Sequence, residues 1–474
     1  MSTFEEAGPP LQSRASELAD RLAALLDRFD VPGAAFALAR GDELVTGAAG
    51  VLSCATQYPV TADSWFQIGS ITKLFTATLV MQLVDDGLVA LDEPVRTYLG
   101  AFDVGDEAAS AAITVRHLLT HTSGIQGDYF GDFGRGADAV DRYVASLAGI
   151  DMLHRPGEFF SYCNPGFAVL GVLLQTMRGA DFDSILSERL LHPLGIPGGT
   201  LADQAILHRV AIGHVPGPDG APAVPAPRWA MPYSAGPAGS TPFTDPAGLV
   251  SFARLHMSGG LAPDGTRLLS QAAVDEMQRL QVAVPDFGAI EGIGASWIRY
   301  RWGDQTVLGH DGGTDGQFSF LRVHPPTGSV AVLLTNGPDG GRLFEAFAAP
   351  LFAGLAGAPV PEQVCPPADP PAVDVDRLAG TYLHYGKAVE VRVADGRVAA
   401  TVTAEADEST GDPGLSETFD LVPHSQSTDA VMLVAAVPLR GTHPAVMFPA
   451  PAPGSDEAAR YLRVGGRVFA RSTA

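Results

Sequence analysis

Lysine is almost absent from this chain of 474 residues. Of its 30 cationic side chains only Lys73 and Lys387 are lysines, and all the others are arginines. Arginine stays protonated at any accessible pH, whereas a buried lysine can lose its proton and act as a base. This scarcity indicates that a retained lysine does something arginine cannot do, and Lys73 is the first candidate.

Long apolar runs, cysteine pairs and positive charge are also lacking. Residues 431–439 form one of the longest apolar runs, far shorter than the roughly 20 residues that span a bilayer. The first ten residues contain early acidic side chains and no basic segment before an apolar run, so we expect no secretory signal. Cys54, Cys163 and Cys365 lack metal-ligand spacing. With a net charge of −23, these features predict a cytoplasmic protein without cofactor, metal, nucleic-acid partner or membrane partner.

Strand signals occur at both ends of the first 357 residues, with a mostly helical stretch between them. Helical spacing covers residues 13–29, and apolar runs predict strands at 34–39 and 44–51. Three later strands separated by turns are expected at 307–309, 318–324 and 330–335, followed by a closing helix at 342–355. Strands from both chain ends around a helical insert predict an α+β fold, with one antiparallel sheet flanked by helices.

A proline-rich segment divides the chain. Residues 358–373 predict a semi-rigid linker between a catalytic domain at 1–357 and a small β domain at 374–474. Short strand signals in the last part end at 461–464, and a Gly465-Gly466 turn follows. We expect a small antiparallel β-barrel there.

Ser70 and Lys73 form the strongest chemical motif. In Phe-Gln-Ile-Gly-Ser-Ile-Thr-Lys, residues 66–73, the serine begins a predicted helix that continues to Gly87. The spacing of three residues places Lys73 on the same helix face as Ser70. A capping serine and a solvated lysine would give the same four letters. The scarcity of lysine argues against that alternative.

Two further motifs give the sequence a family resemblance. Tyr162-Cys-Asn164 and His310-Asp-Gly-Gly313 accompany the serine and lysine. Together the motifs resemble those of the serine β-lactamase and penicillin-binding-protein superfamily, in particular its class C-like branch of esterases, D-peptidases and transacylases. The resemblance covers about residues 15–357.

The resemblance implies a role for each matching residue. Ser70 would be the nucleophile, and Lys73 and Tyr162 would move protons, with the phenol held partly ionised by its neighbours. Asn164 would orient the lysine and the substrate. The Ser70 and Gly313 amides would form the oxyanion hole, and Gly312 would let the substrate approach closely. His310 would supply polarity near the leaving group. A core tyrosine and a structural histidine are the plainer alternatives for Tyr162 and His310, and we expect His121 to be structural.

The third motif lacks the lysine and hydroxyl that help hold a substrate carboxylate. This departure disfavours a dedicated β-lactamase and a strict D-Ala-D-Ala carboxypeptidase. We therefore expect a serine hydrolase or acyltransferase that acts through an acyl-enzyme on an ester or amide, D-amino-acid peptides included. One alternative is a penicillin-binding-protein-type thioesterase that releases or cyclises a nonribosomal peptide, and another is a catalytically silent relative used for binding or sensing. The expected partner is a small-molecule or peptide substrate, free or bound to a carrier protein.

The C-terminal β domain resembles the lipocalin-like domain appended to some members of the superfamily. Two roles are open at this point. The domain could cap the catalytic domain, or it could project an arginine such as Arg460 or Arg463 toward the substrate.

Overall fold

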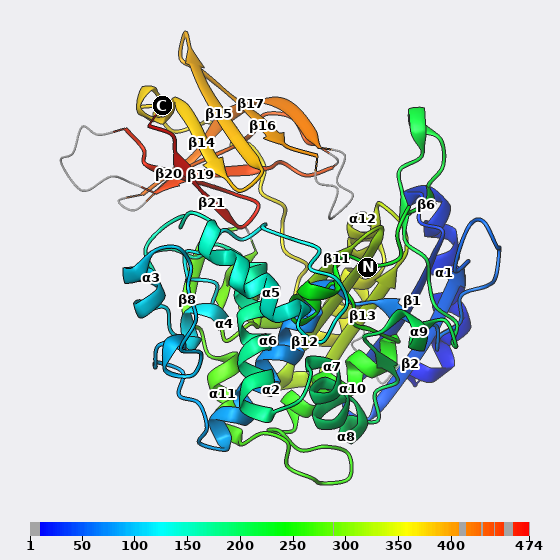
Figure 1. The fold of residues 1–474 in the computed structure, drawn as a ribbon. Helices are drawn as coiled ribbons and strands as arrows, with labels where there is room; N and C mark the ends of the chain where they lie inside the picture. Colours follow the sequence, from blue (N-terminus) through cyan, green and yellow to red (C-terminus); the bar gives the residue numbers. More distant parts are fainter. Residues whose placement is uncertain are drawn as a thin grey trace.

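The computed structural model of the chain describes residues 10–287, 289–406, 414–427, 430–439, 441–449 and 458–473. They form a large α+β body and a β-barrel that lies against it (Figure 1). No helix of the described ranges is long and apolar enough to cross a membrane.

The large body is built on one antiparallel sheet of eight strands. Their order is β2-β1-β13-β12-β11-β10-β9-β8. Strands from both chain ends pair within it, with Ala34 of β1 opposite Thr335 of β13. The predicted α+β class and the antiparallel sheet are thereby confirmed. The strands are β1 (Gly33–Arg40), β2 (Glu43–Gly50), β8 (Val282–Phe287), β9 (Ile290–Ile293), β10 (Ile298–Trp302), β11 (Gln305–Thr314), β12 (Gln317–His324) and β13 (Ser329–Thr335).

Helices cover both faces of this sheet, because its central strands are apolar on both sides. Alternate side chains of a strand point to opposite faces. In β1, Phe36 and Leu38 therefore join one core, while Ala35, Ala37 and Ala39 join the other. The first core is closed by α1 (Ala15–Leu26), α12 (Gly340–Ala346) and α13 (Ala348–Ala356), the last two replacing the single helix predicted at 342–355.

The second core belongs to the helical insert. It contains α2 (Thr72–Asp85), α6 (Asn164–Arg178) and α10 (Pro246–Met257). The shorter helices are α3 (Glu107–Ala112), α4 (Val115–Leu119), α5 (Ala139–Ser146), α7 (Phe182–Leu186), α8 (His192–Leu194), α9 (Ala202–Ala205) and α11 (Gln271–Gln278). Two small sheets complete this part: β3 (Phe66–Gln67) with β7 (Phe243–Thr244) and β4 (Gly198–Gly199), and β5 (His214–Val215) with β6 (Val224–Pro225).

The C-terminal part is a closed antiparallel barrel, which confirms the predicted β-barrel. Its strands follow chain order and β14 closes on β21. The last strand, β21, was not among the strands predicted from sequence. The strands are β14 (Gly380–His384), β15 (Lys387–Ala394), β16 (Arg397–Ala404), β17 (Leu415–Gln426), β18 (Ala430–Ala435), β19 (Ala445–Pro449), β20 (Tyr461–Val464) and β21 (Arg467–Arg471). Helix α13 ends at Ala356 and β14 begins at Gly380, while the domain boundaries at 357/358 and 373/374 stay predictions.

Two turns of the barrel touch the catalytic body. In the β20–β21 turn, the Gly466 carbonyl accepts a hydrogen bond from the Tyr162 amide at 2.9 Å. The adjacent Val468 amide donates to Ser161 Oγ at 3.2 Å. In the β14–β15 turn, the Tyr385 amide donates to Gln126 Oε1 at 3.0 Å. The barrel end formed by these two turns therefore faces the helical insert (Figure 1).

Candidate active site

Ser70 lies in a tight turn directly before α2. The turn, Gly69–Ile71, packs against the end of β11. Gly69 has a φ of +51°, and a Cβ atom there would lie 2.5 Å from the amide nitrogen of Gly313. Only glycine tolerates both the left-handed backbone and this close approach. The glycine before the nucleophile therefore lets the serine turn and β11 meet.

Lys73 faces Ser70 from the first turn of α2 and is fully buried. Its Nζ lies 2.9 Å from Ser70 Oγ and donates a hydrogen bond to the Ala238 carbonyl at 2.6 Å. Burial, reinforced by the positive charge of Arg467, holds the pKa of Lys73 well below its ordinary value. A neutral amine this close to the serine hydroxyl can accept its proton.

Tyr162 lies beside the same pair, and its ring is stacked on His121 with the centroids 4.3 Å apart. Lys73 Nζ lies 5.0 Å from the centre of the Tyr162 ring. The buried hydroxyl of Tyr162 lies near Ser70 but forms no well-aligned hydrogen bond with it. Burial raises the pKa of Tyr162 despite the opposing effects of Ser70 and Arg467. The phenol is therefore protonated, contrary to the expected partial ionisation.

The other expected site residues surround this pair. Asn164 lines the same cavity, and its Nδ2 donates to the Gly127 carbonyl at 3.1 Å. His310 is buried, with Nδ1 2.7 Å from the Asp311 carbonyl. Burial, together with Lys73, lowers the pKa of His310 to about 4, so its ring is neutral at pH 7.

The two glycines of the third motif have different surroundings. Gly313 lines the cavity with Ser70. A Cβ atom at Gly312, by contrast, would fall 2.0 Å from the Ile68 carbonyl. Gly312 is therefore required by the packing of β11 against the serine turn, while close substrate approach at this position stays a prediction.

The catalytic cavity has a volume of about 280 Å³. Met231 lines it and also lines a second cavity of about 560 Å³, so the two adjoin. The second cavity has a partly apolar wall that includes Leu201, Trp229 and Tyr233. A substrate larger than one amino-acid residue has room to extend from Ser70 in this direction.

The barrel adds a residue that sequence reasoning missed. Arg467, the first residue of β21, lines the catalytic cavity. Its guanidinium carbon lies 4.6 Å from the centre of the Tyr162 ring. The Gly465-Gly466 turn was recognised from sequence, but the strand after it was not. Chain position alone gave no signal that this arginine would reach Ser70.

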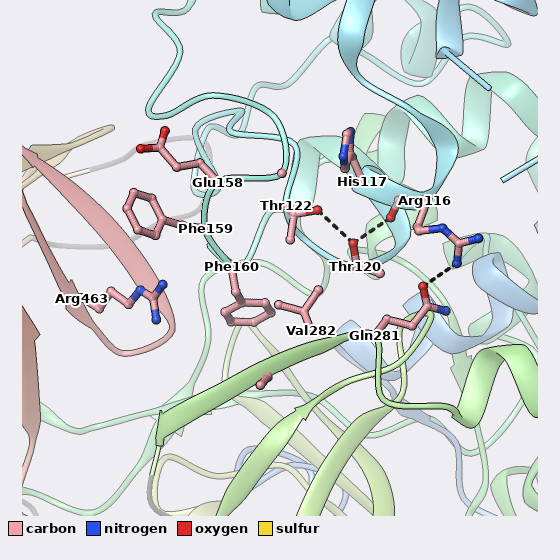
Figure 2. A pocket seen from close by; sticks show the side chains of 12 residues that line it. Arg116, His117, Thr120, Thr122, Glu158, Phe159, Phe160, Gln281, Val282 and Arg463 are labelled. Atoms are coloured by element: carbon pink, nitrogen blue, oxygen red, sulfur yellow. Dashed lines mark hydrogen bonds between the residues drawn. The ribbon is translucent and has the colours of Figure 1, made fainter. Parts of the chain in front are cut away.

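The arginines considered from sequence lie elsewhere. Arg460 is exposed. Arg463 lines a separate cavity of about 450 Å³, together with residues 157–160 of the segment that leads to Tyr162. Figure 2 shows Arg463 reaching into this cavity from the barrel, opposite Phe160 and Val282. The hairpin thus places one arginine in each of two cavities.

The sequence profile of the family described as "Beta-lactamase" matches residues 18–353. This chain belongs to that beta-lactamase family. The chain is also similar to "Penicillin-binding protein 4" of Amycolatopsis lactamdurans, with 43% identity over 373 residues that make up 78% of this chain and 97% of the relative. Family membership predicted from the three motifs is thereby confirmed.

Solved structures extend the likeness of this beta-lactamase-family protein to the barrel. The crystal structure of SurE is similar at a TM-score of 0.77 and 29% identity, covering 97% of this chain and 99% of that one. A structure of SurE with D-Leu matches at a TM-score of 0.74 and 28% identity, covering 97% and 100%. An octameric penicillin-binding protein homologue from Pyrococcus abyssi shares the fold, with a TM-score of 0.63 at 20% identity over 96% and 99% of the two chains.

Proposed function

We propose that the protein is a serine hydrolase or acyltransferase that acts on ester or amide substrates through an acyl-enzyme. The observation that carries the proposal is the 2.9 Å contact between Ser70 Oγ and a buried Lys73 with a lowered pKa. Lys73 takes the Ser70 proton as Oγ bonds to the substrate carbonyl carbon. The amides of Ser70 and Gly313 are the proposed donors to the oxyanion. This arrangement argues against a catalytically silent relative.

The second half of the proposed reaction uses the protonated phenol. Tyr162 gives a proton to the leaving group as the bond from the carbonyl carbon breaks, and the proton held by Lys73 restores the phenol. Water or an amine then attacks the ester carbonyl of the acyl-enzyme, and its proton returns through the same residues to Ser70. An amine acceptor makes the overall reaction a transfer, and water makes it a hydrolysis.

Arg467 supports a substrate with a carboxylate near the reacting carbonyl. The third motif lacks a lysine for this purpose, but the barrel brings a guanidinium to the same cavity. Arginine binds carboxylates with two parallel hydrogen bonds. D-Leu, named with the related SurE structure, carries such a carboxylate. We therefore propose amino-acid or peptide derivatives, D-amino-acid derivatives included, as the substrate class.

A peptidyl thioester donor is the second candidate. The adjoining cavity at Met231 supports it, because that space exceeds what a single amino-acid residue needs. Release of the peptide to water or to its own amine would follow from the same acyl-enzyme. A carrier-bound form of this donor stays a prediction.

Covalent labelling tests the proposal directly. The intact protein and a Ser70→Ala variant are treated with a fluorophosphonate and analysed by peptide mass spectrometry. We expect one adduct on Ser70 and none in the variant. Absence of an adduct on Ser70 in the folded wild-type protein would contradict the proposal. Rates with a nitrophenyl ester, a D-amino-acid amide, a cephalosporin and a peptidyl thioester then rank the substrate classes.

A further inference from the structure

The junction between the barrel and the catalytic domain is centred on one buried carboxylate. Asp128 belongs to the catalytic domain, lines the catalytic cavity and has a side chain that is only 9% exposed. Its Oδ1 accepts hydrogen bonds from Arg467 Nη2 at 2.9 Å and Nε at 3.1 Å. Its Oδ2 accepts one from Lys387 Nζ at 2.6 Å. Both cations come from the barrel.

The charges around Asp128 do not cancel. Arg467 and Lys387 contribute two positive charges, and the carboxylate contributes one negative charge. Burial alone would raise the pKa of Asp128, but the two cations outweigh it and keep the carboxylate ionised. His384 Nε2 lies 3.8 Å from Oδ2, and burial lowers the pKa of this histidine to about 4, so it is neutral at pH 7. One net positive charge remains beside Ser70.

Only Arg467 of the two cations lines the catalytic cavity. Its contacts with Asp128 and with the Gly465 carbonyl use the Nε, Nη1 and Nη2 atoms. These are three of the five N–H groups that a guanidinium carries. Arg467 can therefore still offer a substrate carboxylate N–H donors as well as a positive charge. Without Lys387, however, Asp128 would neutralise Arg467 and most of this attraction would disappear.

We infer that Lys387, which lies outside the catalytic cavity, sets the preference of the site for carboxylate-bearing ligands by balancing the charge of Asp128. Asp128 is in turn the positioning residue that holds Arg467 over the cavity. The inference rests on the proposed function, because it concerns the group that lies next to the reacting carbonyl.

The test compares two ligands that differ in one charge. D-Leucine and D-leucinamide are used to protect Ser70 from the fluorophosphonate, and the ratio of their protection constants is measured for each full-length variant. We expect the wild type to favour D-leucine. In Lys387→Met this ratio should fall on the order of tenfold, the effect of removing one unit charge near the bound carboxylate at an effective dielectric of about 20. Lys387→Arg should restore the ratio.

A matched control separates this effect from a general loss of charge. Arg392 lies at the other end of β15, is 73% exposed and pairs with Glu390. Arg392→Met should leave the ratio unchanged. Equal protection by both ligands in the wild type, or a wild-type ratio in Lys387→Met, would overturn the inference while Ser70 labelling still supports the proposed function. Loss of labelling in the wild type would instead refute the proposed function itself.

Discussion

The catalytic domain and the barrel use their interiors in opposite ways. The catalytic domain keeps open cavities beside Ser70, whereas the described part of the barrel has an interior filled by large apolar side chains. Tyr382, Phe419, Leu433, Phe448 and Phe469 are among these residues. The residues that the barrel gives to the site lie instead in and beside its turns. An accessory barrel can therefore act through its surface turns, although barrel mouths are common binding places.

The two domains also differ in how far apart their site residues lie in sequence. Ser70 and Lys73 meet because one helical turn joins them. Arg467 shares the catalytic cavity with Ser70 only because the barrel is held on the helical insert by Asp128, Ser161 and the Tyr162 amide. The first arrangement is local, and the second requires both domains to be folded and docked. Four variants test this contrast.

Lys73→Arg should have the largest effect. Arginine keeps the positive charge but cannot accept a proton from Ser70, so ester turnover should fall about 10³-fold, within the usual range for a lost general base. Steady-state rates and the rate of fluorophosphonate labelling measure the loss. The same replacement at the barrel lysine, Lys387→Arg, should cost less than about threefold, because a cation suffices there. Rapid labelling of Lys73→Arg would contradict the role of Lys73.

Leu433→Ala should destabilise the barrel by about 3 kcal/mol, since it removes a fully buried side chain from a filled core. Urea unfolding followed by circular dichroism measures this change. Val437→Ala, at a side chain that is 60% exposed, should change stability by less than about 0.5 kcal/mol. The fluorophosphonate should still label Ser70 in the folded Leu433→Ala variant. If Leu433→Ala left the free energy of unfolding unchanged, the barrel would not depend on a filled interior, and the contrast between the domains would be wrong.

Arg467→Met should lower kcat/KM for carboxylate-bearing substrates by about 30-fold, from the loss of a charged hydrogen-bonding partner. It should also shift the pH profile. Arg467 lowers the pKa of Lys73, and Lys73 must be neutral to act as the base. Removing the guanidinium raises that pKa, so activity should be lost at a higher pH as the solution is acidified. Arg463→Met, on the same hairpin but in the other cavity, should leave the acidic limb of the pH–activity profile unchanged. Equal shifts of this limb in both variants would exclude a specific role for Arg467.

Ser161→Ala should have the smallest effect. It removes the acceptor of the Val468 amide at the domain junction and should cost about 1 kcal/mol in the free energy of unfolding. Ser416→Ala, at an exposed position of β17, should be neutral. If Ser161→Ala were equally neutral, this hydrogen bond would not help to hold the barrel in place.

The sequence predicted most elements whose signals are local. The strands near Phe36 and Leu333, the helix after Ser70 and the barrel strands near Val389 follow from apolar patterns of a few residues. The split of the closing helix at Phe347 and the last strand after Gly466 did not. The first depends on packing against the sheet, and the second is a short strand that pairs with β20 across the turn but gains its second partner, β14, only when the barrel closes.

The sequence by itself determined the proposed nucleophile and its proposed base, because Ser70 and Lys73 lie one helical turn apart and their motif matches a family. Tertiary structure decided the charge of the site. Burial and Arg467 together lower the pKa of Lys73, and burial keeps Tyr162 protonated. The docked barrel also places a cation, Arg467, in the cavity, whereas the third motif contains no lysine. Desolvation and charge pairing between distant segments exist only once the chain is folded, and no local pattern encodes them.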